Sequence, residues 1–232
     1  MLLIYLIREM PPEVAFAVLL AYFLAICVAM SLHEFAHSYA AYKHGDMTPK
    51  LSGRLTLNPF AHFSGLGLLS FFLIGFGWAK PVRINPQNFR NYKKGMIAVS
   101  LSGILTNLVL AFLFSGIFYL LVSTGVLFST TLYSTNLFIT FLYYFIYFTI
   151  FLNLALFIFN LLPIYPLDGF NFIATFLRYD NKFVQFMYQF GFVVLLIMII
   201  PIFNGQSILG MFYSNVMSWI INLFIGFWQL FF

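Results

Sequence analysis

Apolar and polar residues fall into long blocks along this chain, without the short periods of a helix or strand that faces water on one side. Five apolar runs are long enough to cross a hydrocarbon layer of about 30 Å, which takes about 20 helical residues. These runs cover approximately residues 14–42, 96–122, 137–162, 184–201 and 208–231. The pattern predicts an all-α polytopic membrane protein with about five transmembrane helices.

The segment between the first two runs, residues 43–95, breaks this pattern. Its stretch LSGRLTLNP (51–59) alternates like a short strand, and LGLLSFFLIGFGW (66–78) is apolar for only about a dozen residues, too few for a comfortable crossing. We therefore expect a re-entrant or short-strand membrane-associated element here. We expect a single integral-membrane domain over residues 1–232, with a core at about 14–175 and additional transmembrane helices at about 184–231.

Composition and charge support a membrane location. The chain is 62% hydrophobic and 7% charged, whereas about a quarter of the residues of a typical soluble domain are charged. Too few charges remain to coat a soluble protein, so lipid must cover much of the surface. The formal charge of +5 does not indicate nucleic acid, because the basic residues do not form a surface interleaved with aromatics. The single cysteine, Cys27, excludes a cysteine-based zinc motif.

The distribution of Lys and Arg predicts the orientation. If residues 66–78 do not cross the membrane, ten of the eleven Lys and Arg residues share one side, and Arg8 alone lies on the other. Cytoplasmic loops of membrane proteins carry an excess of Lys and Arg. The ten are Lys43, Lys50, Arg54, Lys80, Arg83, Arg90, Lys93, Lys94, Arg178 and Lys182.

The first apolar run contains three ionisable residues, although each is costly in hydrocarbon unless it pairs or has a function. They form the motif HEFAH, with His33 and His37 four residues apart and Glu34 beside the first. Residues i and i+4 share one helix face, so the two imidazoles can converge on one tetrahedral zinc ion. In such motifs the glutamate takes a proton from the attacking water. The motif predicts a catalytic zinc site.

A catalytic zinc ion usually has three protein ligands, so a third must come from elsewhere. Asp168 is favoured because it follows the third long run in NLLPIYPLDG, where Pro163 and Pro166 prevent a regular helix and Gly169 permits a tight turn. Depth agrees, because His37 lies roughly 8 Å from the charged end of its helix and Asp168 follows the end of the third span at the same charged side. The acidic and imidazole candidates are Glu9, Glu13, His44, Asp46, His62, Asp168 and Asp180.

At these residues the sequence resembles the site-2 protease family of intramembrane zinc metalloproteases, particularly its small bacterial and archaeal members. The resemblance rests on HEFAH (33–37), on GRLTLNPFAHFSGLG with GWAKPVRINPQNFR, and on NLLPIYPLDG (160–169). It implies one Zn²⁺ held by His33, His37 and Asp168, with Glu34 as the general base. It also implies that Asn160 assists by hydrogen bonding to substrate.

The resemblance also has a departure. Family members often have Gly-Pro followed by Asn early in the second core span, whereas this chain reads Ser102-Gly103-Ile104-Leu105-Thr106-Asn107 without the proline. From the sequence we expect a helix-packing role for Asn107. His44 and His62 lie in the basic segment, where loop histidines are more common than ligands.

The expected function is hydrolysis of peptide bonds within or near transmembrane segments of other membrane proteins, in a bacterial cytoplasmic membrane with the active site toward the cytoplasm. Two alternatives are a membrane metal transporter and a non-catalytic zinc-binding scaffold. The expected partners are transmembrane protein substrates and the lipid bilayer, without nucleic acid. A regulatory membrane partner and a homo-oligomer are both compatible with the sequence, which identifies neither.

Overall fold

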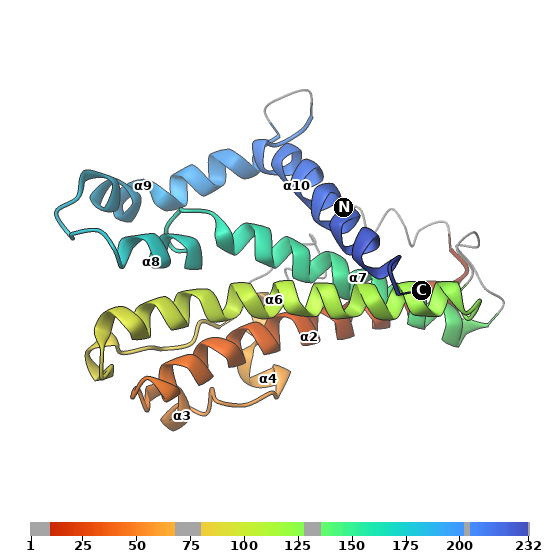
Figure 1. The fold of residues 1–232 in the computed structure, drawn as a ribbon, viewed down its shortest axis with the longest axis horizontal. Helices are drawn as coiled ribbons and strands as arrows, with labels where there is room; N and C mark the ends of the chain where they lie inside the picture. The colour runs from red at the N-terminus through yellow and green to blue at the C-terminus, as the bar shows by residue number, and fades with distance from the viewer. Residues whose placement is uncertain (1–9, 68–79, 128–135, 202–204, 232) are drawn as a thin grey trace.

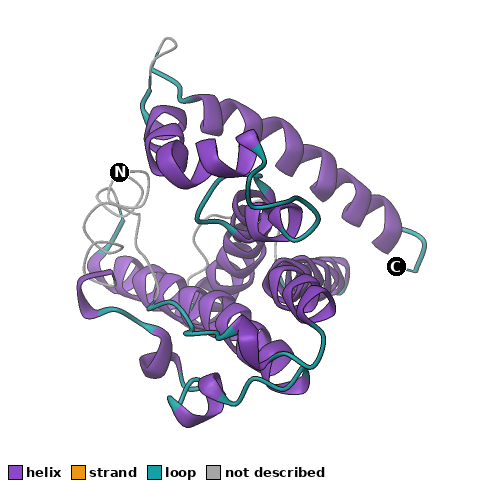
Figure 2. Cartoon of the chain, turned by 90° about the vertical axis from the view of Figure 1, so that its left-hand side faces the viewer, coloured by secondary structure: helices purple, strands orange, loops and turns teal. Residues whose placement is uncertain are grey.

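The computed structural model describes residues 10–67, 80–127, 136–201 and 205–231. Five long helices in this part of the chain have the length and apolar character to span a membrane. They are α2 (Pro12–Lys43), α6 (Tyr92–Ser123), α7 (Leu137–Leu161), α9 (Lys182–Ile199) and α10 (Ile208–Trp228). All five predicted spans are confirmed, and the protein is an all-α multi-pass membrane protein whose described residues contain no strand (Figure 2).

Three of these helices form the centre of the molecule. Helices α2, α6 and α7 lie side by side with alternating chain direction, and α9 and α10 lie over them (Figure 1). Apolar residues of α2 and α7 form the largest buried cluster, in which Tyr22 packs edge-on against Phe148 at 4.9 Å between ring centroids. A second cluster joins α10 to α6 and α7 through Ala111, Leu154 and Ile220.

The alternating direction gathers three helix ends at one end of the bundle, namely the C-terminal end of α2, the N-terminal end of α6 and the C-terminal end of α7 (Figure 1). Asparagine caps fix where α6, α7 and α9 begin. The side chains of Asn91, Asn136 and Asn181 accept hydrogen bonds from backbone N–H groups of the first turns. Each cap pairs a donor that the helix itself leaves unpaired.

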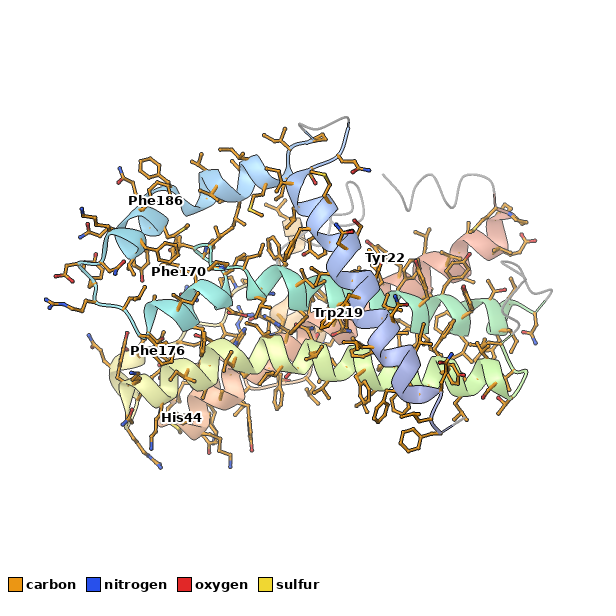
Figure 3. All side chains as sticks on the ribbon, turned by 45° about the horizontal axis from the view of Figure 1, so that its top comes forward. Tyr22, His44, Phe170, Phe176, Phe186 and Trp219 are labelled. Atoms are coloured by element: carbon orange, nitrogen blue, oxygen red, sulfur yellow. The ribbon has the colours of Figure 1, made fainter. Side chains whose placement is uncertain are left out.

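The outer faces of the helices are apolar, as lipid contact requires. On α6 the stripe Leu105, Val109 and Leu113 repeats every four residues, and each side chain is at least half exposed. Figure 3 shows Phe186 of α9 and Trp219 of α10 on the outside, and Trp219 is 65% exposed. Such a surface is stable in hydrocarbon and not in water, which agrees with the composition.

The described residues that follow α2 are helical in part. They form two short helices, α3 (Thr48–Leu51) and α4 (Pro59–His62), and Phe63 packs against the α2–α7 cluster. The alternative of a strand at residues 51–59 is wrong in the described structure, because the helix-start signals outweigh the alternating pattern of these residues. Pro49 lies in the first turn of α3, and Asn58 caps α4. Most of residues 66–78 lies outside the described part of the chain.

Asp46 connects this segment to the residues that precede α6. Its buried carboxylate accepts hydrogen bonds from Thr48 N and Oγ1 at 3.0 and 2.6 Å, from Asn85 N at 2.8 Å and from Asn88 Nδ2 at 2.8 Å. Burial disfavours the charged form, but these bonds outweigh it and hold the pKa of the carboxyl below its ordinary value. Asp46 therefore fixes the chain around η1 (Pro86–Asn88) against the end of α2.

The chain between α7 and α9 is irregular where the prolines predict it. Helix α7 ends at Leu161, and the next helix, α8 (Asp168–Ala174), begins at Asp168. The tight-turn role expected for Gly169 is not what the structure shows, because Gly169 is helical and does not have a positive φ. Its missing Cβ instead leaves room for the backbone carbonyl of Leu161, so α8 folds closely against the end of α7.

Candidate metal centre

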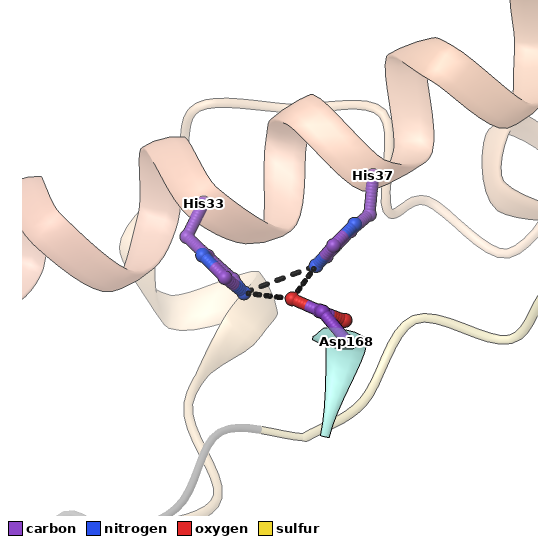
Figure 4. A group of neighbouring side chains, drawn as sticks. All are labelled: His33, His37 and Asp168. Atoms are coloured by element: carbon purple, nitrogen blue, oxygen red, sulfur yellow. Dashed lines mark hydrogen bonds and ion pairs between the residues drawn. The ribbon is translucent and has the colours of Figure 1, made fainter. Parts of the chain in front are cut away.

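Three predicted ligands from two distant parts of the sequence meet at the end of the bundle. His33 and His37 point from one face of α2 toward Asp168, the first residue of α8 (Figure 4). The two Nε2 atoms are 3.0 Å apart, and Asp168 Oδ2 lies 3.4 Å from the first and 3.2 Å from the second. Both histidines are buried. The arrangement follows from the i, i+4 spacing and from the proline-broken end of α7.

The hydrogen bonds on the far side of each imidazole decide which nitrogen faces the cluster. His33 Nδ1 lies 2.6 Å from Asn107 Oδ1, and His37 Nδ1 lies 2.8 Å from the carbonyl oxygen of Val99. Both oxygens can only accept, so each Nδ1 carries the hydrogen and donates. Both Nε2 atoms then direct lone pairs toward each other and toward a carboxylate, which is repulsive unless a cation lies between them.

These donors fit zinc. Imidazole nitrogen and carboxylate oxygen bind zinc at about 2.0–2.2 Å in tetrahedral geometry, which places ligand atoms about 3.3 Å apart. The three separations here span 3.0–3.4 Å. Asp168 Oδ2 is buried with no hydrogen-bond partner in the described chain besides the imidazoles that it faces. His33, His37 and Asp168 are the residues in the described chain whose ligand atoms group in this way.

A cavity of about 340 Å³ opens onto this cluster. Glu34 lines it together with the three candidate ligands, so the predicted base shares one cavity with the predicted ligands. Asn160 also lines it; its Nδ2 donates to the carbonyl oxygen of Leu156 at 3.1 Å, and its Oδ1 has no hydrogen-bond partner among the described residues. The far wall comes from the segment before α6, through Val82, Ile84 and Pro86.

The remaining candidates for a third ligand lie elsewhere or are already bonded. Asp46 is held by its own hydrogen bonds, and the exposed Asp180 pairs with Arg178 at 3.2 Å. His62 is buried beside the carbonyl oxygen of Thr56, and His44 ends α2. Glu13 lies in the first turn of α2, at the opposite end of that helix, and Glu9 lies outside the described residues.

The role of Asn107 differs from the sequence expectation. It is fully buried and packs between helices as expected, but it also contacts His33 directly. The sequence contains one signal for this contact: an amide within an apolar span needs a hydrogen-bond partner. Asn107 also lies four residues after Gly103, on the same face of α6. The sequence does not identify the partner, because that depends on how α6 packs on α2.

Gly103 makes the close packing of α6 against the two histidines possible. A Cβ at this position would lie 2.5 Å from His33 Cε1 and 2.6 Å from His37 Nε2. We expect Gly103→Ala to displace the imidazoles, to destabilise the protein by about 1–3 kcal/mol and to weaken zinc binding. Thermal unfolding and zinc content check this.

Gly226→Ala is the matched control for Gly103→Ala. Gly226 is also within a membrane-length helix, and a Cβ there would meet nothing within 4 Å. Alanine is favoured over glycine in a helix by about 1 kcal/mol, so this variant should be as stable as the parent or more so. Equal stability and zinc content in the two variants would contradict the packing role of Gly103.

Helices of membrane-spanning length surround an HExxH motif, and a carboxylate completes the cluster as the third ligand. These features define the class of an intramembrane metalloprotease. Comparison with known families identifies the family. The family model described as Peptidase family M50 matches residues 21–198, which include most of α2 and all of α6, α7 and α8. This chain belongs to Peptidase family M50, and it is an intramembrane zinc metalloprotease.

Curated relatives agree with this assignment. A Bacillus subtilis (strain 168) protein named "Putative zinc metalloprotease YwhC" is 38% identical over 179 residues, which cover 76% of this chain and 78% of the relative. A Mycobacterium tuberculosis (strain H37Rv) protein named "Putative zinc metalloprotease Rip2" is 30% identical over 207 residues, which cover 84% of this chain and 71% of the relative. No solved structure matches this chain.

Proposed function

We propose that this enzyme hydrolyses peptide bonds within or near the transmembrane segments of other membrane proteins, with His33, His37 and Asp168 as zinc ligands and Glu34 as general base. The observation that carries this proposal is the convergence of the three ligand atoms, 3.0–3.4 Å apart, in a cavity that Glu34 also lines. Their position among helices of membrane-spanning length supports a membrane-protein substrate.

Each residue has a separate part in the reaction. Zinc, when bound, supplies Lewis-acid chemistry, lowering the pKa of water toward about 7 and polarising the scissile carbonyl. Glu34 accepts the proton of the attacking water and passes it to the leaving amine. The amide oxygen of Asn160 has no partner in the described chain, and it accepts a hydrogen bond from the substrate at the cavity wall.

The substrate must be locally unwound, because a helix hides its carbonyl groups in hydrogen bonds. The cavity wall before α6 suits an extended chain. The backbone N–H and C=O groups of Val82, Arg83 and Ile84 form no hydrogen bond with any described residue, while Val82 and Ile84 line the cavity. An unwound segment that lies along this wall regains the backbone hydrogen bonds that it lost.

We also propose that the site faces the cytoplasm across a bacterial cytoplasmic membrane. All Lys and Arg residues except Arg8 lie within residues 43–94 or are Arg178 and Lys182. The segments that contain them connect helices at the site end of the bundle. The excess of positive charge at that end favours a cytoplasmic location. We propose further that residues 1–232 form one integral-membrane domain, which the packing of α10 on α6 and α7 supports.

Two substrates that differ in one feature test the substrate class. Purified enzyme in lipid is mixed with a single-span protein whose span contains a Gly-Pro pair near its cytoplasmic end, or with the same protein carrying Leu-Ala there. We expect the helix-breaking span to be cut at least about tenfold faster, because proline removes a helix hydrogen bond at a cost of about 3 kcal/mol or more. Equal rates, or cleavage confined to soluble loops, would contradict the proposal.

A further inference from the structure

Beyond the metal ligands, the cluster rests on a buried chain of amide side chains that crosses all three central helices. His33 Nδ1 of α2 lies 2.6 Å from Asn107 Oδ1 of α6, and Asn107 Nδ2 lies 2.7 Å from Asn153 Oδ1 of α7. Both asparagines are fully buried. Neither touches the cavity that holds the site, so neither meets substrate.

Two backbone carbonyls determine the direction of every hydrogen bond in this chain. Asn153 Nδ2 lies 2.8 Å from the carbonyl oxygen of Thr149, which can only accept, so Asn153 must place Oδ1 toward Asn107. Asn107 Nδ2 then donates to Asn153 and lies 3.3 Å from the carbonyl oxygen of Ala29. With its amide nitrogen committed to two acceptors, Asn107 can present only Oδ1 to His33.

The last link sets the state of the ligand. Because Asn107 Oδ1 can only accept, His33 carries its hydrogen on Nδ1 and presents a lone pair on Nε2, as a zinc ligand must. We infer that Asn107 is a positioning residue for zinc, which holds His33 in the ligating tautomer, and that Asn153 fixes the orientation of the Asn107 amide. This inference rests on the proposed zinc ligands.

The same reasoning explains why the two histidines are not equivalent. His37 Nδ1 donates to a backbone carbonyl, that of Val99, which no side-chain substitution removes. The orientation of His33 depends on a side chain instead. Residues that orient ligands from behind change metal affinity by about 10- to 100-fold when they are replaced, so the effect should appear in zinc binding itself.

Zinc affinity of the purified full-length protein tests the inference. The wild type, Asn107→Leu and Asn107→Asp are equilibrated in zinc buffers of graded free concentration, and bound zinc is measured by mass spectrometry. Asn107→Leu should bind zinc about 10- to 100-fold more weakly. Asn107→Asp keeps an acceptor for His33 Nδ1 and loses the donor to Asn153. Its zinc affinity should therefore equal that of the wild type to within a few-fold.

The pair of variants separates positioning from simple packing. Both lose the hydrogen bond to Asn153, so a packing role alone would lower the melting temperature of the metal-free protein and weaken zinc binding equally in both. Ser115→Ala is the control, because it removes another interhelical bond of α6, to Trp228 Nε1 at 2.9 Å, far along the helix. It should leave zinc affinity unchanged.

The outcomes distinguish this inference from the proposed function. Wild-type zinc affinity in Asn107→Leu, or equal weakening in Asn107→Leu and Asn107→Asp, would overturn the positioning role and leave the ligands intact. A wild type that binds no zinc would overturn both. If Asn107→Leu does not fold, Asn153→Leu replaces it; this variant leaves the His33 bond and frees the Asn107 amide, and it should weaken zinc binding by a few-fold.

Discussion

Glu34→Gln is expected to abolish peptide cleavage while zinc stays bound at one ion per chain. Glutamine has nearly the same shape, but its amide cannot take a proton from water. General-base catalysis contributes about 10²- to 10⁴-fold to such reactions, so the cleavage rate should fall by at least that factor. Glu34 lines the cavity without joining the three-atom ligand cluster, and this explains why metal and activity should separate. Zinc content and cleavage of a single-span substrate are measured on the same preparation.

Glu13→Gln is the matched control for this prediction. It makes the same chemical change in the same helix, in the exposed first turn at the opposite end of α2, and both activity and zinc should be retained. Loss of zinc in Glu34→Gln would make Glu34 a ligand. Undiminished cleavage would remove it as the base. Glu34→Gln also tests the transporter alternative. Zinc transport does not require a general base, so a transporter need not lose its activity in this variant.

Asp168→Ala should lose zinc, and with it all cleavage. Asp168 provides the third ligand atom, and without it two imidazoles remain, which is fewer than the three protein ligands of a typical catalytic zinc site. We expect zinc affinity to fall by more than about 100-fold, beyond the effect of replacing a residue that only orients a ligand. The measurement is zinc retained after dialysis against a chelator.

Asp168 does not act as a helix cap in this structure. The capping position of α8 belongs to Leu167, and no side-chain hydrogen bond caps this helix. Loss of the carboxylate should therefore lower the zinc affinity more than the stability of α8. Asp180→Ala is the control, since this exposed acid pairs with Arg178 outside the site. Zinc retained in Asp168→Ala at the level of Asp180→Ala would exclude Asp168 as a ligand.

The parts of the fold that local sequence determines could be predicted. Each of the five spans depends on its own apolar length, and the observed helices α2 and α6 differ from the predicted runs mainly by extending a few residues into polar ends. His33 and His37 were predictable for the same reason, since their spacing on one helix fixes their relation. Asp168 needed more, namely the prolines that end α7.

Features that depend on contacts between helices were not predictable in the same way. The link from Asn107 to His33 requires α6 to pack on α2 at the height that Gly103 permits. Asn153 belongs to no recognisable motif, because it is an isolated amide among mostly apolar neighbours in α7. The strand alternative for residues 51–59 was wrong because alternation over a few residues is weaker than the proline and asparagine signals at either end.

The site also shows how a membrane enzyme can keep ionisable groups in hydrocarbon. Each imidazole has an acceptor behind Nδ1 and directs the lone pair of Nε2 at the proposed zinc site. The polar side chains that support it, Asn107 and Asn153, have their hydrogen bonds satisfied across three helices. Buried polar groups that are fully bonded stabilise one arrangement, whereas a missing partner would be costly.

The most direct test of the central claim is to map the cut in a single-span substrate by mass spectrometry while zinc is measured in the same enzyme preparation. The account predicts one zinc ion per chain and a scissile bond inside the span, near its cytoplasmic end, with no cut by Glu34→Gln. Stoichiometric zinc without cleavage, or an enzyme that cuts without zinc, would contradict it.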